Sequence, residues 1–209
     1  MKSGFLRGIF SLALASAALV AHASAPVRVE GVQNAAWLDR GGVAEPLVAG
    51  MEIRAADRVR TGTNARVQLQ LGEGSAVKLG ENAVLTIERA GSSGGIYRAA
   101  LNVAQGAFRF TTGAAAGNLR REVDIRVRNI TAGIRGTDLW GRSNAERDLV
   151  CLIEGKITVT ADGAPAVTMS QPLDFFQKPR GAPALAVGKV DRRQLDEWAR
   201  ETEPLKLSN

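Results

Sequence analysis

The sequence has few of the residue types that most often carry catalysis. Its 209 residues include one histidine, His22, and one cysteine, Cys151. His22 lies in the apolar amino-terminal stretch, so the rest of the chain contains no histidine. These absences exclude Ser-His-Asp and Cys-His arrangements and histidine-based zinc sites, and a lone cysteine excludes an internal disulfide. We therefore expect no catalytic residues, no cofactor and no metal site.

Aromatic residues are also scarce, and the remaining enzyme motifs are incomplete. The aromatic content of 5% is thin for a sugar-binding cleft. Gly155-Lys156 is not a phosphate-binding loop, because that motif needs a glycine where Val150 stands. Calcium-binding loops are not indicated either, since the alternating acids are missing. Two catalytic carboxylates need not be close in sequence, so a carbohydrate-active or envelope-glycan-binding protein using paired carboxylates stays as the alternative to a purely binding protein.

The first 23 residues have the pattern of an export signal. Lys2 and Arg7 precede an apolar run over residues 8–20, and Ala21-His22-Ala23 places small residues where signal peptidase cleaves. The run is shorter than the roughly 20 residues of a membrane span, so we predict cleavage and no stable span afterwards. Cleavage would remove Lys2 and Arg7 but no aspartate or glutamate, so the formal net charge would fall from +6 to +4. The predicted mature chain begins at Ser24 in the periplasm.

Most of the remaining chain alternates apolar and polar residues with a period of two, as strands with one buried face do. Glycine-rich turns separate these segments at intervals of roughly 8–12 residues, which is typical of sandwiches and rolls. Residues 149–153 (LVCLI) are apolar throughout, which predicts a central strand buried on both faces, with Cys151 as a small buried hydrophobe. We predict an all-β fold, a compact β-sandwich or roll of many short strands, with strands over residues 66–71, 77–79, 85–88, 107–110, 123–128, 149–153 and 157–159.

The pattern also divides the chain into segments. We predict a β domain over residues 24–167, with flexible loops at 91–95 and 113–118, then an irregular extension and linker over 168–188 and a short carboxy-terminal helix over 189–204. Asp191 can cap the helix, with Gln194 placed for the reciprocal hydrogen bond. Leu195 and Trp198 fall on one face of the helix, which we expect to pack on the β core, with docking to another protein as the alternative.

Arginine dominates the positive charge. Arg120, Arg121, Arg126 and Arg128 lie close together, and residues 124, 126 and 128 are expected to share one strand face. Export argues against nucleic acid as a partner. This face is then either a solvated polar surface or a contact for an acidic partner or an anionic envelope polymer.

One stretch, TAGIRGTDLWG over residues 131–141, holds the candidate binding residues Arg135, Gly136, Thr137 and Asp138. Gly133 and Gly136 permit positive φ or close backbone approach, which suits a corner between strands. Thr137 and Asp138 can bond the amides of such a corner. Arg135 can clamp backbone carbonyls or a carboxylate. We predict an architectural corner with a buried or half-buried arginine; the alternative is a ligand grip, which requires an exposed Arg135.

Five features occur in the order found in one family of envelope domains. They are Gly50 to Gly62 with Asp57 and Thr61-Gly62, Gly74-Ser75 leading to Leu79, Gly106 to Phe110 (GAFRF), Ala132 to Asp138 (AGIRGTD), and Glu154 to Val159 (EGKITV). Together, between about Val27 and Val159, they resemble the FecR domain, which is named after the regulator of ferric citrate uptake. The first feature departs from the family pattern by one extra residue between Gly50 and Ile53.

The resemblance implies a β-rich periplasmic module with a role in protein contacts within the cell envelope. The iron-uptake regulators of this family resemble anti-sigma factors, with a cytoplasmic segment that holds a sigma factor and a spanning helix behind it. Here the domain directly follows the predicted export signal, so sigma-factor binding is not carried over. We predict a non-enzymatic binding or signalling module, with an envelope protein as partner.

Overall fold

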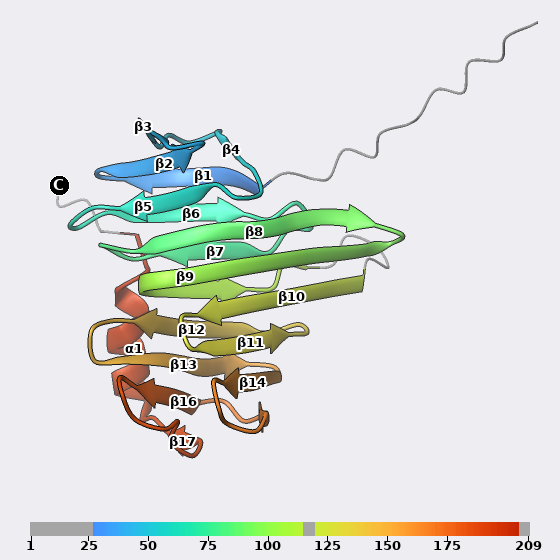
Figure 1. Cartoon of the computed structure of the whole chain (residues 1–209), viewed down its shortest axis with the longest axis vertical. Coiled ribbons are helices and arrows are strands. Elements are labelled where there is room, and N and C mark those ends of the chain that lie inside the picture. The colour runs from blue at the N-terminus through green and yellow to red at the C-terminus, as the bar shows by residue number, and fades with distance from the viewer. Residues whose placement is uncertain (1–26, 115–119, 205–209) are drawn as a thin grey trace, which may run out of the picture.

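The computed structural model describes residues 27–114 and 120–204, which form strands throughout and end in one helix (Figure 1). The predicted export signal and most of the predicted loop at 113–118 lie outside the described residues. The all-β prediction, with a short carboxy-terminal helix, is confirmed. The elements are β1 (Val27–Gln33), β2 (Ala36–Arg40), β3 (Val43–Pro46), β4 (Glu52–Ile53), β5 (Arg58–Thr61), β6 (Arg66–Gln70), β7 (Ala76–Leu79), β8 (Val84–Ser93), β9 (Ile96–Thr111), β10 (Arg120–Val127), β11 (Ile130–Ile134), β12 (Asp138–Ser143), β13 (Arg147–Glu154), β14 (Ile157–Ala161), β15 (Val167–Met169), β16 (Asp174–Pro179), β17 (Gly188–Lys189) and α1 (Arg192–Arg200).

The strands form two layers, which we call sheet A and sheet B. Sheet A has the order β4-β1-β6-β7-β9-β12-β13-β16-β17, and sheet B has the order β3-β2-β5-β8-β9-β10-β11-β14-β15. The long strand β9 belongs to both, because residues 96–105 pair with β8 in sheet B and residues 106–111 pair with β12 in sheet A. β9 and β10 pair in parallel, and the sheets do not close into a barrel. Figure 1 shows the strands stacked along the long axis of the molecule.

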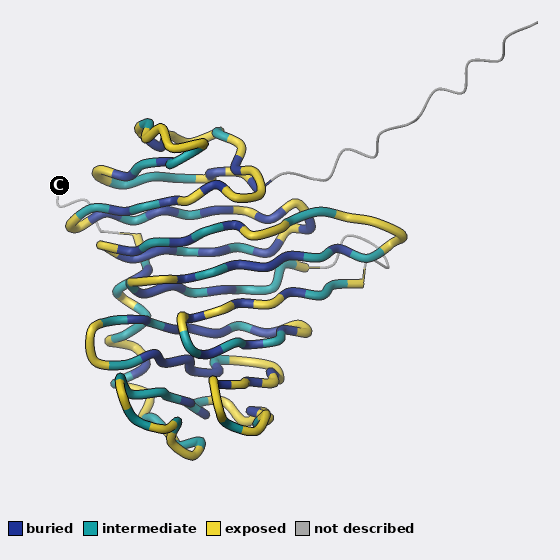
Figure 2. Tube along the Cα trace, in the orientation of Figure 1, coloured by how far each residue is buried: buried dark blue, intermediate teal, exposed yellow. Residues whose placement is uncertain are grey.

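The core lies between the two sheets. Period-two alternation turns Phe108 and Phe110 of sheet A toward Leu85 and Ile125 of sheet B, and all four side chains are fully buried. Figure 2 shows buried residues along the strands and exposed residues at the turns. Burial of each large apolar side chain contributes about 1.5–3 kcal/mol, so this interior is the main source of stability.

Two predicted boundaries differ from the structure. Residues 91–93 were expected in a flexible loop but belong to β8, because pairing with β9 continues to Ser93 opposite Ile96. Only Gly94 and Gly95 remain as the turn, both with positive φ. β10 ends at Val127, and Arg128 takes a left-handed φ of 52°, so Arg128 does not continue the strand face of residues 124 and 126.

The stretch of residues 168–188, expected to be irregular, contributes strands to sheet A. β16 pairs with β13, with Phe176 opposite Val150, and β17 pairs with β16. Phe176 is buried in the core, and Phe175 packs against the cluster on the other face of the sheet. Because both faces of β16 are covered, its sequence lacks the alternation that marks a strand with one buried face.

The helix α1 begins as predicted at its cap and differs in its side-chain pairing. Asp191 Oδ1 accepts a hydrogen bond from the Gln194 backbone N–H at 2.8 Å. The expected reciprocal bond, in which the Gln194 side-chain oxygen would accept from the Asp191 backbone N–H, is absent; the Gln194 side chain instead donates from Nε2 to Glu197 at 3.2 Å. Among the described residues no helix has the length and apolar content needed to cross a membrane.

The helix packs on the outer face of sheet A, as expected. Trp198 stacks on Trp140 of β12, with ring centroids 5.1 Å apart and planes 12° apart, and Leu195 is buried. Trp140 clusters there with Ala107 and Leu149. Because the helix covers the outer face of β13 and the core covers the inner face, residues 149–153 are apolar on both faces. Cys151 is fully buried, as predicted.

Candidate functional site

The chain forms the predicted corner between strands around Arg135, and the corner depends on two glycines. Gly136, between β11 and β12, has φ +73°, and Gly155, between β13 and β14, has φ +92°. A Cβ atom on Gly155 would collide with the Gly136 carbonyl oxygen and with Thr137. The two turns therefore pack backbone against backbone, which only a residue without a side chain allows at Gly155.

Thr137 and Asp138 connect this corner to β9. Thr137 is buried; its backbone N–H donates to the Thr112 hydroxyl at 2.8 Å, and its carbonyl accepts the Thr112 N–H at 2.9 Å. The side chains of Thr137 and Asp138 were expected to bond the amides of the corner, which is wrong. The buried Thr137 hydroxyl has no hydrogen-bond partner in the described residues, and Asp138 binds an arginine. Its carboxylate accepts hydrogen bonds from Arg109, at 3.0 Å from Nε and 2.7 Å from Nη2, and these bonds raise the pKa of the Arg109 guanidinium.

Arg135 does not have the predicted structural role. Its side chain is exposed and forms no hydrogen bond or ion pair with any residue of the described segments. The expected clamp on Asp138 is made instead by Arg109, which lies between Phe108 and Phe110. Strand alternation predicts that Arg109 lies on the outer face of sheet A. The sequence does not show that β9 and β12 are neighbours, so it does not predict the pairing of Arg109 with Asp138.

Lys156 and Arg135 lie at the same end of the paired strands β14 and β11. The pairing ends at Ile134 opposite Ile157, and Arg135 and Lys156 are the first residues beyond the two strand ends. Both line the same hollow, which is described below. Lys156 is also exposed and has no hydrogen-bond or ion-pair partner among the residues described. Two cations without an ion-pair partner in the described residues thus lie at this end of the sheet.

Gly133 is the second glycine of the stretch, and the backbone does not require it. It has no positive φ, and a Cβ atom there would lie 3.8 Å from both Asp124 Oδ1 and the Thr158 carbonyl oxygen, which is ordinary contact. The expectation that Gly133 serves positive φ or close approach is therefore wrong. Its missing side chain instead leaves a hollow on the outer face of sheet B.

This hollow, which we call the Gly133 groove, has a volume of about 680 Å³. Its walls are polar and come from β10, β11, β14, β15 and the adjoining turns. The residues that line it are Glu122, Val123, Asp124, Gly133, Ile134, Arg135, Lys156, Ile157, Thr158 and Thr168.

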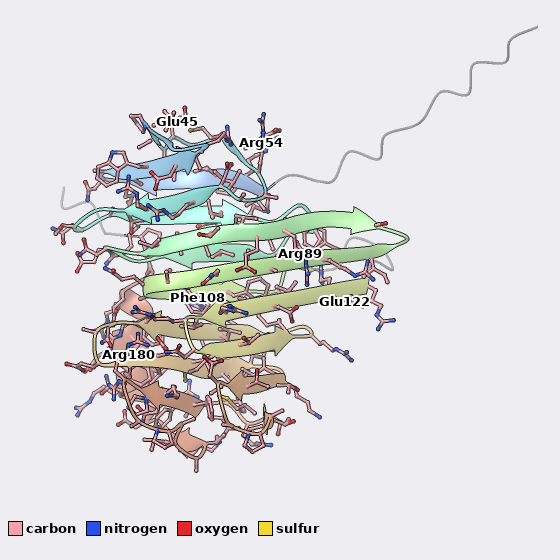
Figure 3. The ribbon with its side chains drawn as sticks, in the orientation of Figure 1. Glu45, Arg54, Arg89, Phe108, Glu122 and Arg180 are labelled. Atoms are coloured by element: carbon pink, nitrogen blue, oxygen red, sulfur yellow. The ribbon has the colours of Figure 1, made fainter. Side chains whose placement is uncertain are left out.

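The charges of the groove are unevenly compensated. Glu122 accepts a hydrogen bond from Arg98 at 2.8 Å, and Asp124 is 3.3 Å from Arg89. Figure 3 labels Arg89 and Glu122 over the long strands β8 to β10. Because both wall carboxylates are paired within the protein while Arg135 and Lys156 are not, the groove favours an anionic group.

The outer face of sheet A is already occupied. We call residues 192–204 the carboxy-terminal strap. Glu203 bonds Lys78 at 2.8 Å and Arg109 at 3.0 Å, and Glu201 bonds Arg142 at 2.8 Å. Lys78, Arg109 and Arg142 of this face are therefore paired with carboxylates of the strap.

A second hollow, of about 450 Å³, bears on the paired-carboxylate alternative. Glu81 and Glu201 both line it, and burial, the largest effect, raises the pKa of Glu201 although Arg142 opposes the shift. The Glu201 carboxylate is bound by Arg142 of β12, and this ion pair holds the strap on sheet A. Among residues 27–114 and 120–204, no group of three or more ligand-type side chains is placed to hold a metal ion.

Comparison with known families assigns this fold. Residues 57–158 match the family model of the FecR protein. This segment is a FecR domain. The resemblance seen in the sequence is thereby confirmed, and β1 to β4 and β15 to β17 extend the two sheets beyond the matched segment of the FecR domain.

Solved structures with the same fold come from Parabacteroides distasonis ATCC 8503. Two crystal structures of a candidate anti-sigma factor, at 1.65 and 2.50 Å resolution, each match with a TM-score of 0.55 and 15% identity over 68% of this chain. The match spans 64% and 63% of those chains, respectively, so this chain covers less than two thirds of their length. At this identity the likeness concerns the fold alone. No curated protein sequence matches the chain.

Proposed function

We propose that this protein, with its FecR domain, is a non-enzymatic binding module of the cell envelope that contacts an envelope protein, in a signalling role, through the outer face of sheet B. One observation carries the proposal. The strap covers the outer face of sheet A over β7, β9 and β12, whereas the outer face of sheet B presents the Gly133 groove with the unpaired Arg135 and Lys156.

The comparisons support the regulatory part of this proposal. The structural neighbours are described as candidate anti-sigma factors, which are regulators and act through protein contacts. The proposal takes from them a role in protein contact and not the binding of a sigma factor, because the predicted export signal would place the domain outside the cytoplasm.

We also propose a periplasmic location, supported by Ala21-His22-Ala23 after the apolar run. Amino-terminal sequencing of the protein recovered from cells should return Ser24 as the first residue in the soluble periplasmic fraction. Recovery of a chain that begins at Met1 in the membrane fraction would contradict the proposal.

Photo-crosslinking in living cells tests the binding face. A photoreactive amino acid at Thr158, in the groove, is compared with one at Gln70, an exposed position on the outer side of sheet A. We expect a discrete protein adduct from Thr158 and none of that size from Gln70. An adduct of equal yield at both positions, or at Gln70 alone, would refute the assignment to sheet B.

The same experiment separates the alternatives. An anionic envelope polymer or another glycan would give a broad ladder of adduct sizes that a protease acting on the partner leaves unchanged. A paired-carboxylate enzyme would show loss of activity on envelope glycans when Glu81 or Glu201 is replaced by glutamine, with the Thr158 adduct unaffected.

A further inference from the structure

We propose that the Gly133 groove binds a carboxylate side chain of an extended acidic polypeptide segment, held between Arg135 and Lys156. This rests on the proposed function and narrows it to one ligand chemistry. The site is defined by two unpaired cations at one end, an open strand face where Gly133 has no side chain, and threonine hydroxyls beyond it.

The two cations form a site that the corner builds. The Gly136 and Gly155 turns pack together, and Arg135 and Lys156 are the residues next to these two glycines, just beyond the last pair of β11 and β14. No described carboxylate lies within ion-pair distance of either cation, so both charges remain available to a ligand. A guanidinium fork and an ammonium on the same face suit a carboxylate, which accepts bidentate hydrogen bonds from arginine.

The two carboxylates of the groove favour a ligand with a single negative charge. Glu122 and Asp124 of β10 both line the groove; Asp124 is paired with Arg89, and Glu122 is paired with Arg98 and, at 3.7 Å, with Arg120. A doubly charged phosphate group would lie near both of them and meet more repulsion than a carboxylate does. The groove therefore favours a carboxylate over a phosphate.

The lining favours a polypeptide over a sugar chain. No aromatic ring lines the groove, so a sugar face has no ring on which to stack. The hydroxyls of Thr158 and Thr168 and the wall carboxylates can bond peptide amides. The groove also reaches β15, the edge of sheet B in the described residues, whose outward backbone groups have no strand partner and suit an extended segment.

A peptide titration on the full mature protein tests the inference. The probe is a capped pentapeptide in which valine and threonine flank one central glutamate, and the matched probe has glutamine in its place. Binding is followed by the backbone amide shifts of Gly133, Gly136, Lys156 and Thr158 in the ¹⁵N-labelled protein. We expect saturable shifts with the glutamate peptide and binding weaker by roughly tenfold or more with the glutamine peptide, as loss of a charge-assisted hydrogen bond implies.

Matched variants separate a site from general positive charge. Arg135→Ala and Lys156→Ala should each weaken glutamate-peptide binding by roughly tenfold or more. Arg126→Ala removes the same charge from an exposed position of β10 outside the groove lining, and should change binding by less than about twofold. Equal weakening by Arg126→Ala and Arg135→Ala would overturn the site.

Gly133→Val tests the groove itself. The backbone at Gly133 accepts a side chain, so this variant should melt like the wild type while the valine fills the hollow and abolishes peptide binding. If the valine variant fails to fold, Gly133→Ala makes the same test with a smaller side chain. Unchanged peptide binding in a folded Gly133 variant would overturn the proposal.

The remaining outcomes identify a wrong ligand class. Tighter binding of inorganic phosphate than of the glutamate peptide would refute carboxylate selection, and tighter binding of an oligogalacturonate would refute the polypeptide. Absence of peptide binding together with a persistent protein adduct from Thr158 would refute this inference and leave the proposed function standing. Loss of both would refute both.

Discussion

Replacement of Arg180 by alanine should strongly destabilise the fold, although this residue lies in a stretch that the sequence marks as irregular. Asp148 on β13 is completely buried, and Arg180 donates to its two oxygens at 2.6 and 2.7 Å. Arg180 also donates to the Asn144 carbonyl at 2.6 Å and the Ser143 hydroxyl at 3.0 Å. Figure 3 shows Arg180 in the part of the stack that holds β13 and β16.

The magnitude follows from what Arg180→Ala leaves behind. Asp148 keeps hydrogen bonds from Asn129, at 3.2 Å from the backbone N–H and 3.0 Å from the side chain, but its charge has lost its counter-ion. Loss of one partner from a buried ion pair costs about 3–5 kcal/mol. For a domain of this size that corresponds to a fall in the melting midpoint of roughly 6–20 °C.

Urea unfolding, followed by tryptophan fluorescence, measures this loss. Asp148→Asn in the Arg180→Ala background removes the stranded charge and should recover about 1–3 kcal/mol. Arg147→Ala serves as control, because Arg147 bonds only the neutral Gln177 side chain, at 3.2 Å, and should cost less than about 1 kcal/mol. A loss below about 1 kcal/mol for Arg180→Ala, or no recovery in the double variant, would refute the reasoning.

Three further predictions concern the strap, the thiol and the corner. Trp198→Ala should cost about 2–3 kcal/mol by loss of its stack on Trp140, as unfolding midpoints would show; a neutral result would mean that the strap does not cover sheet A in solution. Cys151 should resist a bulky maleimide in the native protein at pH 8, because burial raises the pKa of its thiol to about 12; rapid labelling would contradict its burial. Gly155→Ala should cost about 2 kcal/mol or more, because its Cβ meets the Gly136 carbonyl at a positive φ, and a melt equal to the wild type would show that the two turns do not interlock.

The sequence predicts the strands correctly where one face of the strand is buried and the other is exposed to solvent. Residues 66–71 and 157–159 alternate strictly, and β6 and β14 lie there. Alternation fails where both faces are covered, as in β16, and where a strand continues through glycines, as at residues 91–93 of β8. In these places long-range pairing overrides local composition.

The candidate site shows the same division between local and distant causes. Gly136 as the turn residue of a corner follows from backbone chemistry, and the structure agrees. The partner of Asp138 does not follow from the sequence, because Arg109 reaches it only through the pairing of β9 with β12. Once Arg109 holds Asp138, Arg135 is left free, which reverses the role that its neighbours in the sequence suggest.

The central claim is that the corner presents Arg135 to a partner and does not use it to hold the fold. Urea unfolding of Arg135→Ala beside the wild type tests this claim most directly. We predict free energies of unfolding that agree within about 0.5 kcal/mol, as for a surface side chain without partners. A loss of about 2–4 kcal/mol, the cost of removing a buried arginine clamp, would contradict the claim.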